Sequence, residues 1–394
     1  FARMTNNELD IVLTTPEFLS LHADQFATSQ NISFVVFDEA HHVGMNASEG
    51  RLAYAQMPQV LKMLGSPQVL ATTATATTQA AQHICELLSI EAGHVYKDKT
   101  ARTNLELKDL RGAKDRECAL LSLVSDGTKT VVYVNSREQA QALTRILRHR
   151  IPELGHKIAF YHAGLTPQIR KNVERAFRRG DVCCIMATSA FGEGVNISDI
   201  RQVILYHLPF GRVAFNQMSG RAGRDGKPSK IQMLFDAHDM RVNERILSSH
   251  APQREALVAV YRALTALQSK LGAPADGSVL TDEDIAQMAL EIDPRSKADE
   301  QTVRVALDVF AELGFISIEG FDQTRTISVN SQASHMDLLE SARYAEGLKA
   351  HTEFESFAQW VLSASPDELA DAITKPIVPE IGSTFDGGRE SSDE

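Results

Sequence analysis

Cysteine is scarce in this sequence of 394 residues, and long apolar runs are absent. None of the four cysteines (Cys85, Cys118, Cys183 and Cys184) forms a C-x-x-C pair, which argues against a disulfide framework and against a zinc ribbon. We therefore expect a reducing, cytoplasmic compartment. No apolar run approaches the roughly 18 residues that a membrane-spanning helix needs, so we expect no membrane partner. Hydrophobic residues at 43% and charged residues at 23% exclude a largely disordered chain.

The net charge of −11 is unevenly distributed along the chain. Residues 101–245 hold 24 Lys and Arg against 15 Asp and Glu, whereas residues 246–394 hold 11 against 26. A basic middle within an acidic chain is typical of a surface that binds a polyanion. It is equally typical of a solvated basic face with no ligand, and charge alone leaves both interpretations open.

The two ends of the sequence carry predictions of their own. The chain begins with Phe1 and no signal peptide follows, so we expect it to be part of a longer protein. From residue 376 onward, Pro, Gly, Ser and acidic residues dominate. This composition predicts a disordered acidic tail over residues 376–394.

Short apolar runs alternate with helical stretches over the first 245 residues. This alternation predicts βαβ units with parallel sheets, and its restart near residue 101 predicts two such domains that face each other across a cleft. Thr166 followed by Pro167 marks a helix start, and a further helix is expected over residues 137–151. The expected strands lie within residues 10–15, 33–40, 67–77, 130–136, 157–164, 182–191 and 202–209.

The remaining sequence is helical and acidic in character. We expect a helical linker over residues 246–279, a winged-helix unit over 280–332 and a helical C-terminal region over 333–375. The order helix, helix, hairpin suggests the winged helix, with Phe321 at the tip of the hairpin. A duplex-handling role and a packing or partner-binding role both remain open, although the excess of acidic residues speaks against contact with DNA.

The tetrapeptide DEAH directly follows the apolar run SFVVF. A carboxylate at the end of a buried parallel strand, next to a second carboxylate, suits magnesium–phosphate chemistry. Asp38 can hold the metal, and Glu39 can orient or deprotonate the attacking water. A polar strand end followed by a helix cap is the alternative interpretation.

A second motif, QMSGRAGRDG, spans residues 217–226. Arg221 and Arg224 are separated by small residues, so both guanidinium groups can reach into a tight cleft. There they can neutralise the charge on a transferred phosphoryl group. A basic, glycine-rich surface turn is the alternative.

Together these motifs resemble the superfamily 2 nucleic-acid helicases, and within them the RecQ-like group. The resemblance implies an α/β fold of tandem RecA-like parallel-sheet domains, the first truncated to residues 1–100 and the second at 101–245. An α-rich region with the winged-helix unit would follow. The resembling motifs, in the order of the family, are LTTPEFL, DEAH, ATTATA, ARTNL, VVYVNSREQA, AFYHAGL, ATSAFGEGVN and QMSGRAGRDG.

The resemblance also implies a function and its residues. It implies an ATP-dependent DNA helicase or translocase that uses ATP with Mg²⁺ and acts on single-stranded or forked DNA in repair or recombination, near the bacterial nucleoid. Asp38 would hold the magnesium shell, and Thr73 and Thr75 would couple ATP hydrolysis to movement. The nucleotide-binding and catalytic residues implied are Asp38, Glu39, His41, Gly194, Gln217, Arg221 and Arg224. The implied nucleic-acid contacts are Thr15, Pro16, Glu17, Asn135, Ser136, Arg137, His162 and Thr188.

The sequence departs from the family in three respects. It has no G-x-x-x-x-G-K-[ST] phosphate loop, so we expect that loop upstream of Phe1 and negligible ATPase activity from this chain by itself. The stretch after DEAH contains a single aromatic residue, Tyr54, where RecQ proteins carry an aromatic-rich loop. No cysteine follows Cys184, so the zinc domain of RecQ proteins is absent from this sequence.

Two alternative functions remain open. Residues 341–379 resemble the end of RecJ-type single-strand exonucleases that carry a RecQ-like region, so the chain could extend a nuclease located upstream. It could also be a nucleic-acid-binding accessory module without turnover. Glu39, Arg221 and Arg224 favour an enzyme, because a binding module has no need for a water-orienting carboxylate.

Overall fold

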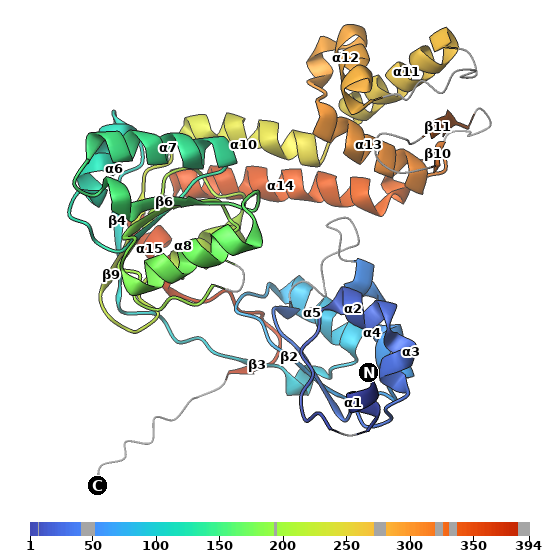
Figure 1. Ribbon diagram of the computed structural model, residues 1–394, viewed down its shortest axis with the longest axis horizontal. Coiled ribbons are helices and arrows are strands. Elements are labelled where there is room, and N and C mark those ends of the chain that lie inside the picture. Colours follow the sequence, from blue (N-terminus) through green and yellow to red (C-terminus); the bar gives the residue numbers. More distant parts are fainter. Residues whose placement is uncertain are drawn as a thin grey trace. The chain divides into compact units, whose positions relative to one another are not determined.

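The computed structural model describes residues 1–6, 8–40, 52–192, 195–271, 281–319, 326–330 and 337–384. The chain divides into two compact units, each assembled from segments that lie far apart in the sequence (Figure 1). Unit 1 comprises residues 1–99, 248–350 and 377–394, and unit 2 comprises residues 100–247 and 351–376. In the described part of the chain, no helix combines the length and apolar character needed to cross a membrane.

A six-stranded sheet forms the centre of unit 2, in the order β4-β9-β8-β5-β7-β6 with every neighbouring pair parallel. Four helices alternate with these strands along the sequence, as the α/β pattern predicts. The strands are β4 (Leu105–Asp109), β5 (Thr130–Tyr133), β6 (Ile158–Tyr161), β7 (Cys184–Ala187), β8 (Gln202–Leu205) and β9 (Ser229–Met233). The helices are α6 (Arg116–Val124), α7 (Arg137–Arg150), α8 (Pro167–Arg179) and α9 (Arg212–Ser219), with a 3-10 turn, η4, at Gly155–Lys157.

Both faces of this sheet are buried. Successive side chains of a strand point to opposite sides, so each strand contributes to two cores. Val132 and Met186 face one core, which is closed by apolar residues of α6 and α7. Val131 and Ile185 face the other core, which is closed by residues of α8 and α9. Thr166 caps the start of α8 by accepting a hydrogen bond from the backbone N–H of Ile169, as its position before Pro167 predicts.

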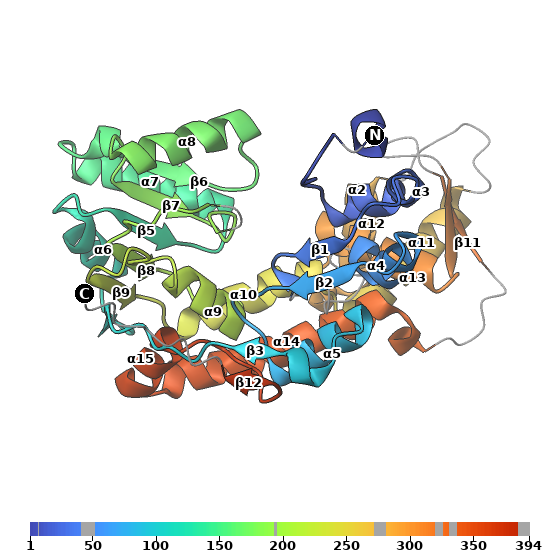
Figure 2. The same ribbon diagram turned by 90° about the horizontal axis from the view of Figure 1, so that it is seen from below.

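The second core also contains residues from the C-terminal part of the chain. Phe354 and Phe357 belong to α14 (Ala342–Ser363), and Leu369 belongs to α15 (Pro366–Thr374). Helix α15 contacts β4 and α9 (Figure 2). The expectation of a separate helical region over residues 333–375 is therefore wrong for residues 351–375. Their apolar side chains fill a sheet face that the local helices leave incomplete.

The first segment of unit 1 contains a two-stranded parallel sheet, in which β1 (Phe34–Phe37) pairs with β2 (Gln68–Ala71). Phe34 is 50% exposed, Val36 55% and Leu70 46%, although strands of a parallel sheet are ordinarily buried on both faces. The other elements of this segment are α1 (Ala2–Thr5), α2 (Pro16–Leu21), α3 (Ala23–Ala27), α4 (Leu52–Met63), α5 (Thr78–Leu88), η3 (Ala92–His94) and β3 (Tyr96–Lys97).

The strand expected within residues 10–15 does not form. Ile11 and Leu13 are 79% and 94% exposed, and no neighbouring strand in the described residues pairs with this stretch. A strand gains its hydrogen bonds from a neighbour, so an apolar run without a partner stays irregular.

The helical module of unit 1 shows the predicted order of helix, helix and hairpin. Strands β10 (Ile316–Glu319) and β11 (Thr326–Val329) pair antiparallel after α12 (Asp282–Ile292) and α13 (Glu300–Glu312). The predicted linker is wrong in one respect, because α11 (Arg254–Leu271) contributes Leu257, Val260 and Leu264 to the same core. The remaining elements are α10 (Ala237–His250), η5 (Pro294–Ser296) and η7 (Leu338–Glu340).

The expected disordered tail is wrong for residues 377–384. Strand β12 (Ser383–Thr384) pairs parallel with β3, and the carbonyl oxygen of Ile377 accepts a hydrogen bond from the backbone N–H of Ala76. Composition predicted disorder because these residues bury little apolar surface. Backbone hydrogen bonds to unit 1 fix them instead.

The position of α14 makes a prediction about stability. Phe354 is 1% exposed, so Phe354→Ala should lower the free energy of unfolding of unit 2 by about 3–5 kcal/mol. The measurement is urea unfolding followed by the fluorescence of Trp360, the single tryptophan of the chain. Ser356→Ala, at an exposed position of the same helix, is the control. An unchanged unfolding midpoint in Phe354→Ala would show that α14 folds apart from the sheet.

Candidate functional site

Asp38 and Glu39 lie at the carboxyl end of β1 and are both exposed. The Oδ1 atom of Asp38 accepts a hydrogen bond from Thr72 Oγ1 at 3.2 Å and one from the backbone N–H of Glu39 at 3.0 Å. Glu39 has a positive φ of 51°, a conformation that costs energy for a residue with a side chain. Thr72, in the motif ATTATA, is thus bonded to Asp38 of the motif DEAH. The sequence analysis did not predict this contact. The position of Thr72 after β2, next to the end of β1, is the signal that could have found it.

The predicted coupling residues form a tight turn. Thr73 Oγ1 donates to the carbonyl oxygen of Thr75 at 3.0 Å and accepts from its backbone N–H at 3.3 Å. Thr75 is buried, and its Oγ1 has no hydrogen-bond partner in the part of the chain that the structure describes. The turn leads directly into α5, whose N-cap is Thr77.

The predicted nucleic-acid contacts of unit 1 lie at the start of α2. Thr15 caps this helix by accepting a hydrogen bond from the backbone N–H of Phe18 at 3.3 Å. Pro16 occupies the first helical position and Glu17 lies in the first turn. The N-terminus of a helix favours negative charge, but at Thr15 the side-chain oxygen is already used by the helix itself.

Three adjacent strands of unit 2 bring further predicted residues together. Strand β7 lies between β5 and β6, so the three carboxyl ends occupy one edge of the sheet. Ser136 follows β5, Thr188 follows β7 and His162 follows β6. Ser136 caps α7, and the backbone N–H of Thr188 donates to the carbonyl oxygen of Tyr161 at 3.1 Å. Open α/β sheets bind ligands at this edge.

Asn135, at the same edge, has structural partners. Its Nδ2 donates to the carbonyl oxygen of Leu208 at 2.7 Å and to Oδ1 of Asn243 at 2.5 Å. Asn243 is fully buried on α10. The amide nitrogen of Asn135 therefore holds α10 against the sheet, and only its oxygen remains for another contact.

His162 and Arg137 form the electrostatic centre of this edge. His162 is 4% exposed, its Nε2 lies 3.2 Å from Nε2 of Gln141, and its ring stacks on Phe160. Burial lowers the pKa of His162, the charge of Arg137 lowers it further, and Glu138 opposes both. The side chain of Arg137 is exposed at the first position of α7. An exposed guanidinium beside a neutral imidazole suits the binding of a phosphate.

The arginine motif follows α9. Gln217 lies on that helix, half-buried. Arg221 is half-buried and its Nη1 donates to the carbonyl oxygen of Val195 at 2.8 Å. Arg224 is exposed, with a long hydrogen bond of 3.4 Å from its Nε to the carbonyl oxygen of Gly220. The two arginines therefore differ: Arg221 joins the motif to Val195, whereas Arg224 is exposed.

Arg102 binds the backbone of this motif, a role that the sequence analysis did not predict. Its guanidinium donates to the carbonyl oxygens of Gly220, Ala222 and Gly223 at 2.6–3.0 Å. Gly223 has a φ of +55°, and a Cβ there would lie 2.5 Å from Nδ2 of Asn104. Only glycine fits at this position. The signal in the sequence was the string ARTNL, whose arginine and asparagine both bind the turn.

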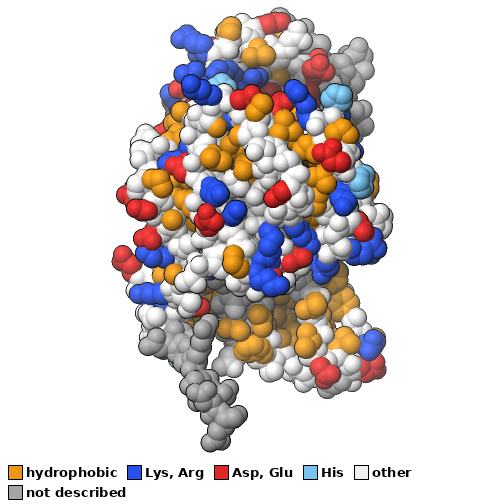
Figure 3. Space-filling view, turned by 90° about the vertical axis from the view of Figure 1, so that its left-hand side faces the viewer, with side chains coloured by type: hydrophobic (Ala, Val, Ile, Leu, Met, Phe, Trp, Pro, Cys, Tyr) orange, Lys and Arg blue, Asp and Glu red, His pale blue; other side chains and the backbone are white. Residues whose placement is uncertain are grey.

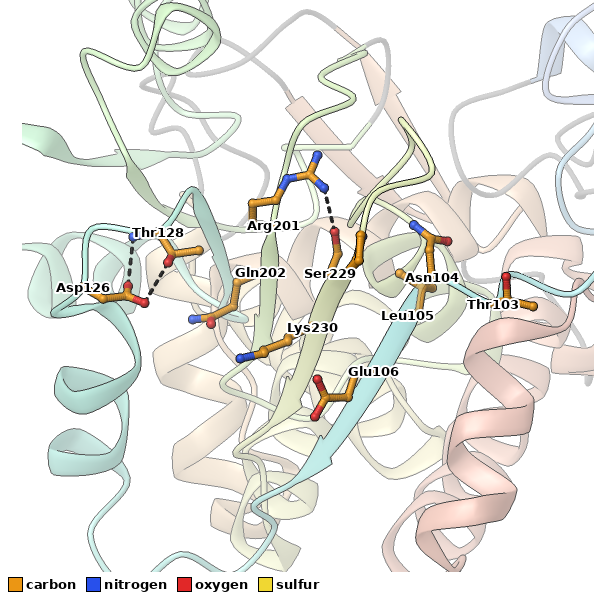
Figure 4. Close-up of a pocket in the computed structure, with 11 residues that line it drawn as sticks. Thr103, Asn104, Leu105, Glu106, Asp126, Thr128, Arg201, Gln202, Ser229 and Lys230 are labelled. Carbon is orange, nitrogen blue, oxygen red and sulfur yellow. Dashed lines mark hydrogen bonds between the residues drawn. The ribbon is translucent and has the colours of Figure 1, made fainter.

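A pocket of about 450 Å³ opens at the amino ends of β4, β8 and β9 (Figure 4). Arg201 and Lys230 are its cations, and Glu106 and Asp126 are its acids. Arg201 Nη1 donates to Ser229 Oγ at 3.2 Å, as Figure 4 shows. Balanced charge does not favour a polyanion, and the pocket lies away from the carboxyl edge that holds Ser136, Thr188 and His162. The residues that line this pocket are therefore not part of the predicted site.

On the face of the molecule that Figure 3 shows, Lys and Arg gather in several groups with Asp and Glu between them. Three predicted residues, His41, Gly194 and Phe321, lie outside the described residues.

Comparison with known proteins agrees with the motifs. Residues 1–84 match the DEAD/DEAH box helicase family, and residues 114–226 match the helicase conserved C-terminal domain. The crystal structure of the DUF1998 helicase MrfA bound to DNA and AMPPNP matches with a TM-score of 0.50 at 19% identity, over 86% of this chain and 49% of that one. This likeness shows the fold, and it confirms the expectation of tandem RecA-like domains followed by an α-rich region.

Several curated relatives are named as DNA helicases, and one, from Acanthamoeba polyphaga mimivirus, is named a putative ATP-dependent RNA helicase. The chain is 34% identical over 239 residues to the probable ATP-dependent DNA helicase RecS of Bacillus subtilis, which covers 59% of this chain and 47% of RecS. It is 32% identical over 228 residues to the ATP-dependent DNA helicase RecQ of Pasteurella multocida, which covers 57% of this chain and 35% of that protein. The chain thus spans less than half the length of either relative.

The environment of His162 predicts a pH dependence. Because its pKa is lowered in the folded protein, His162 favours the neutral form, and the stability linked to it falls as the pH drops through the unfolded value of about 6.5. Arg137→Gln should raise the pKa of His162 without restoring it fully, since burial is the larger cause. An NMR titration of the imidazole measures the pKa of His162 in the unaltered protein and in the Arg137→Gln variant. Arg145→Gln, at an exposed position of α7, is the control, and an equal shift there would contradict the assignment.

Proposed function

Because the chain belongs to the RecQ-like group of superfamily 2 helicases, we propose that it forms part of an ATP-dependent DNA helicase that moves on single-stranded DNA in repair or recombination. The observation that carries this proposal is the arginine turn of unit 2. Residues 220–224 are held by Arg102, by the close packing at Gly223 and by the bond from Arg221 to Val195. This fixed backbone presents Arg224 exposed. A preorganised cation of this kind stabilises charge in phosphoryl transfer.

Each nucleotide-site residue receives a role within its own unit. Asp38 would hold Mg²⁺, and its hydrogen bond from Thr72 fixes the rotamer in which it does so. Bound Mg²⁺ would neutralise phosphate charge. Glu39 orients the attacking water, Arg224 is the arginine finger, and Gln217 and Arg221 contact the nucleotide or transmit its state. Thr73 and Thr75 respond through their turn, which precedes α5.

The phosphate-binding loop is proposed to come from residues upstream of Phe1. The sequence contains no such loop, and the apolar residues Phe34, Val36 and Leu70 on the β1–β2 sheet are exposed. Both relatives described above are more than twice as long as the segment they share with this chain. Further strands beside β1 and β2, with the helices that connect them, would bury those side chains and bring the loop near the end of β1, where Asp38 lies.

Single-stranded DNA is proposed to cross the carboxyl edge of the unit 2 sheet. Arg137 would contact a phosphate, and the backbone and hydroxyl groups at Ser136 and Thr188 would contact the same strand. His162 contacts Gln141 and so connects the end of β6 to α7, the helix that carries Arg137. The N-terminus of α2, with Thr15, Pro16 and Glu17, would contact the strand on unit 1.

Neither alternative function gains support. In the described residues no group of three His, Cys, Asp or Glu side chains is arranged to hold a metal ion. The nuclease alternative places its chemistry upstream of this chain, and the two relatives described above are named as helicases. A binding module without turnover would have no use for an exposed Arg224 on a backbone fixed by Arg102. For the module formed by α12, α13, β10 and β11, duplex handling and packing both remain as interpretations.

The role of Arg224 makes the first functional prediction. Arg224→Ala should lower ATP turnover of the full-length protein by orders of magnitude, since arginine fingers contribute about 10³–10⁵ in rate. Binding of single-stranded DNA should be nearly unchanged. Steady-state ATPase assays and DNA titrations measure the two effects, with the exposed Arg179→Ala as the control. A fall of less than about tenfold, or roughly 1.4 kcal/mol, would remove the assignment.

The proposed DNA path leads to the second functional prediction. Affinity for single-stranded DNA should fall steeply with salt and depend little on sequence, because phosphate contacts release counterions. Arg137→Gln should reduce the steepness of a log–log plot by about 0.7, the share of one phosphate contact on a single strand. Fluorescence anisotropy at several salt concentrations measures the slope. A flat salt dependence in the unaltered protein would indicate base stacking instead.

A further inference from the structure

The C-terminal segment packs directly against the helix that precedes the arginine turn. Arg212, the first residue of α9, lies over the ring of Trp360 at 4.0 Å. Phe215, also on α9, contacts the rings of Phe357 and Trp360 with centroid distances of 6.0 and 6.2 Å. Asn216 Nδ2 donates to the carbonyl oxygen of Ala372 at 2.7 Å. Both α14 and α15 therefore contact α9.

Arg102 connects the end of α15 to the same turn. Its backbone N–H donates to the carbonyl oxygen of Thr374 at 2.9 Å, while its guanidinium holds residues 220, 222 and 223. One residue thus binds both the last turn of α15 and the backbone beneath Arg224. Arg102 therefore links Thr374 to the arginine turn through its own hydrogen bonds.

The segment then binds unit 1 beside the coupling residues. The carbonyl oxygen of Ile377 accepts from the backbone N–H of Ala76 at 3.2 Å, directly after Thr75. The backbone N–H of Glu380 donates to Thr78 Oγ1 at 3.0 Å, at the start of α5. These two bonds enclose the N-cap of α5, the element into which the coupling turn leads.

Lys97 and Gly382 fix the end of this contact. Lys97 Nζ donates to the carbonyl oxygens of residues 379, 380 and 381 at 3.0–3.1 Å. Gly382 has a φ of +86°, and a Cβ there would lie 2.4 Å from the carbonyl oxygen of Val95. Only glycine allows this approach, so the bound conformation is specific to the sequence.

From these contacts we propose that residues 351–384 form a positioning strap between the arginine turn of unit 2 and the coupling turn of unit 1. Only Lys375 and Pro376 separate its last bond in unit 2, at Thr374, from its first bond in unit 1, at Ile377. Pro376 limits the conformations of that connection. The strap also binds Lys97 and Arg102, which flank another of the four connections between the units, residues 98–101.

The strap deepens the proposed function and rests on it. Neither Lys97 nor Gly382 touches a nucleotide-site residue in any contact described above, so both act through the strap as positioning residues. Releasing residues 377–384 from unit 1 should leave ATP binding intact. It should weaken the response of the arginine turn to DNA, because Thr374 is then no longer tethered to the coupling turn.

The experiment compares Lys97→Met and Gly382→Ala with Lys99→Met in the full-length protein. Lys99→Met removes the same charge two residues away, at an exposed position. Hydrogen exchange of residues 377–384 and of Ala76 should become faster in the first two variants and stay unchanged in the control. The DNA-stimulated kcat should fall by about fivefold or more, while KM for ATP and DNA affinity change by less than about twofold. Lys97→Arg should retain the activity of the unaltered protein.

Two outcomes would overturn the strap. One is faster exchange at residues 377–384 with the DNA-stimulated kcat unchanged, which leaves the contact a purely structural role in unit 1. The other is unchanged exchange in both variants, which shows that Lys97 and Gly382 do not anchor the segment. If the unaltered protein has no DNA-stimulated ATPase activity, the proposed function fails separately. Exchange at residues 212–225 with and without DNA then tests the strap by itself, and a response equal in all variants overturns it.

Discussion

The burial of the unit 2 sheet on both faces is the constraint on which the rest of this structure depends. Parallel strands expose no polar face to water, so each side requires a complete layer of apolar side chains. Helices α6 and α7 close one side. On the other side α8 and α9 are joined by α14 and α15, which bring Phe354, Phe357 and Leu369 from more than a hundred residues away. Residues of α14 and α15 therefore complete the core of unit 2.

The same constraint arranges the proposed chemistry. Because every strand runs in one direction, the carboxyl ends of β5, β7 and β6 meet at one edge, and Ser136, Thr188 and His162 follow them. The arginine turn is fixed by a separate device, the cluster of carbonyl oxygens around Arg102. Strand order positions the proposed DNA contacts, whereas the half-buried guanidinium of Arg102 positions the proposed catalytic turn.

Local signals in the sequence were sufficient to predict many of the helices and strands. Thr166 before Pro167 predicted the start of α8, and the apolar runs predicted β1, β2 and β5–β8. The failures share a cause, which is dependence on a distant partner. Within the described ranges, residues 10–15 have no neighbouring strand to pair with. Residues 377–384 are ordered by hydrogen bonds to Ala76, Thr78 and Lys97. Neither the absence of a partner nor its presence is visible in local composition.

The basic excess of residues 101–245 is the part of the sequence signal that most needs reinterpretation. Arg102 and Arg111 donate to carbonyl oxygens of residues 220, 222, 223, 361 and 364, and Arg111 also pairs with Asp109. Arg116 and Arg201 pair with Asp239 and Asp225. A guanidinium held in this way by the protein cannot release a counterion from DNA. The proposed DNA path therefore needs fewer phosphate contacts than the net charge suggests, and its proposed contacts are arginines such as Arg137, exposed at a strand end.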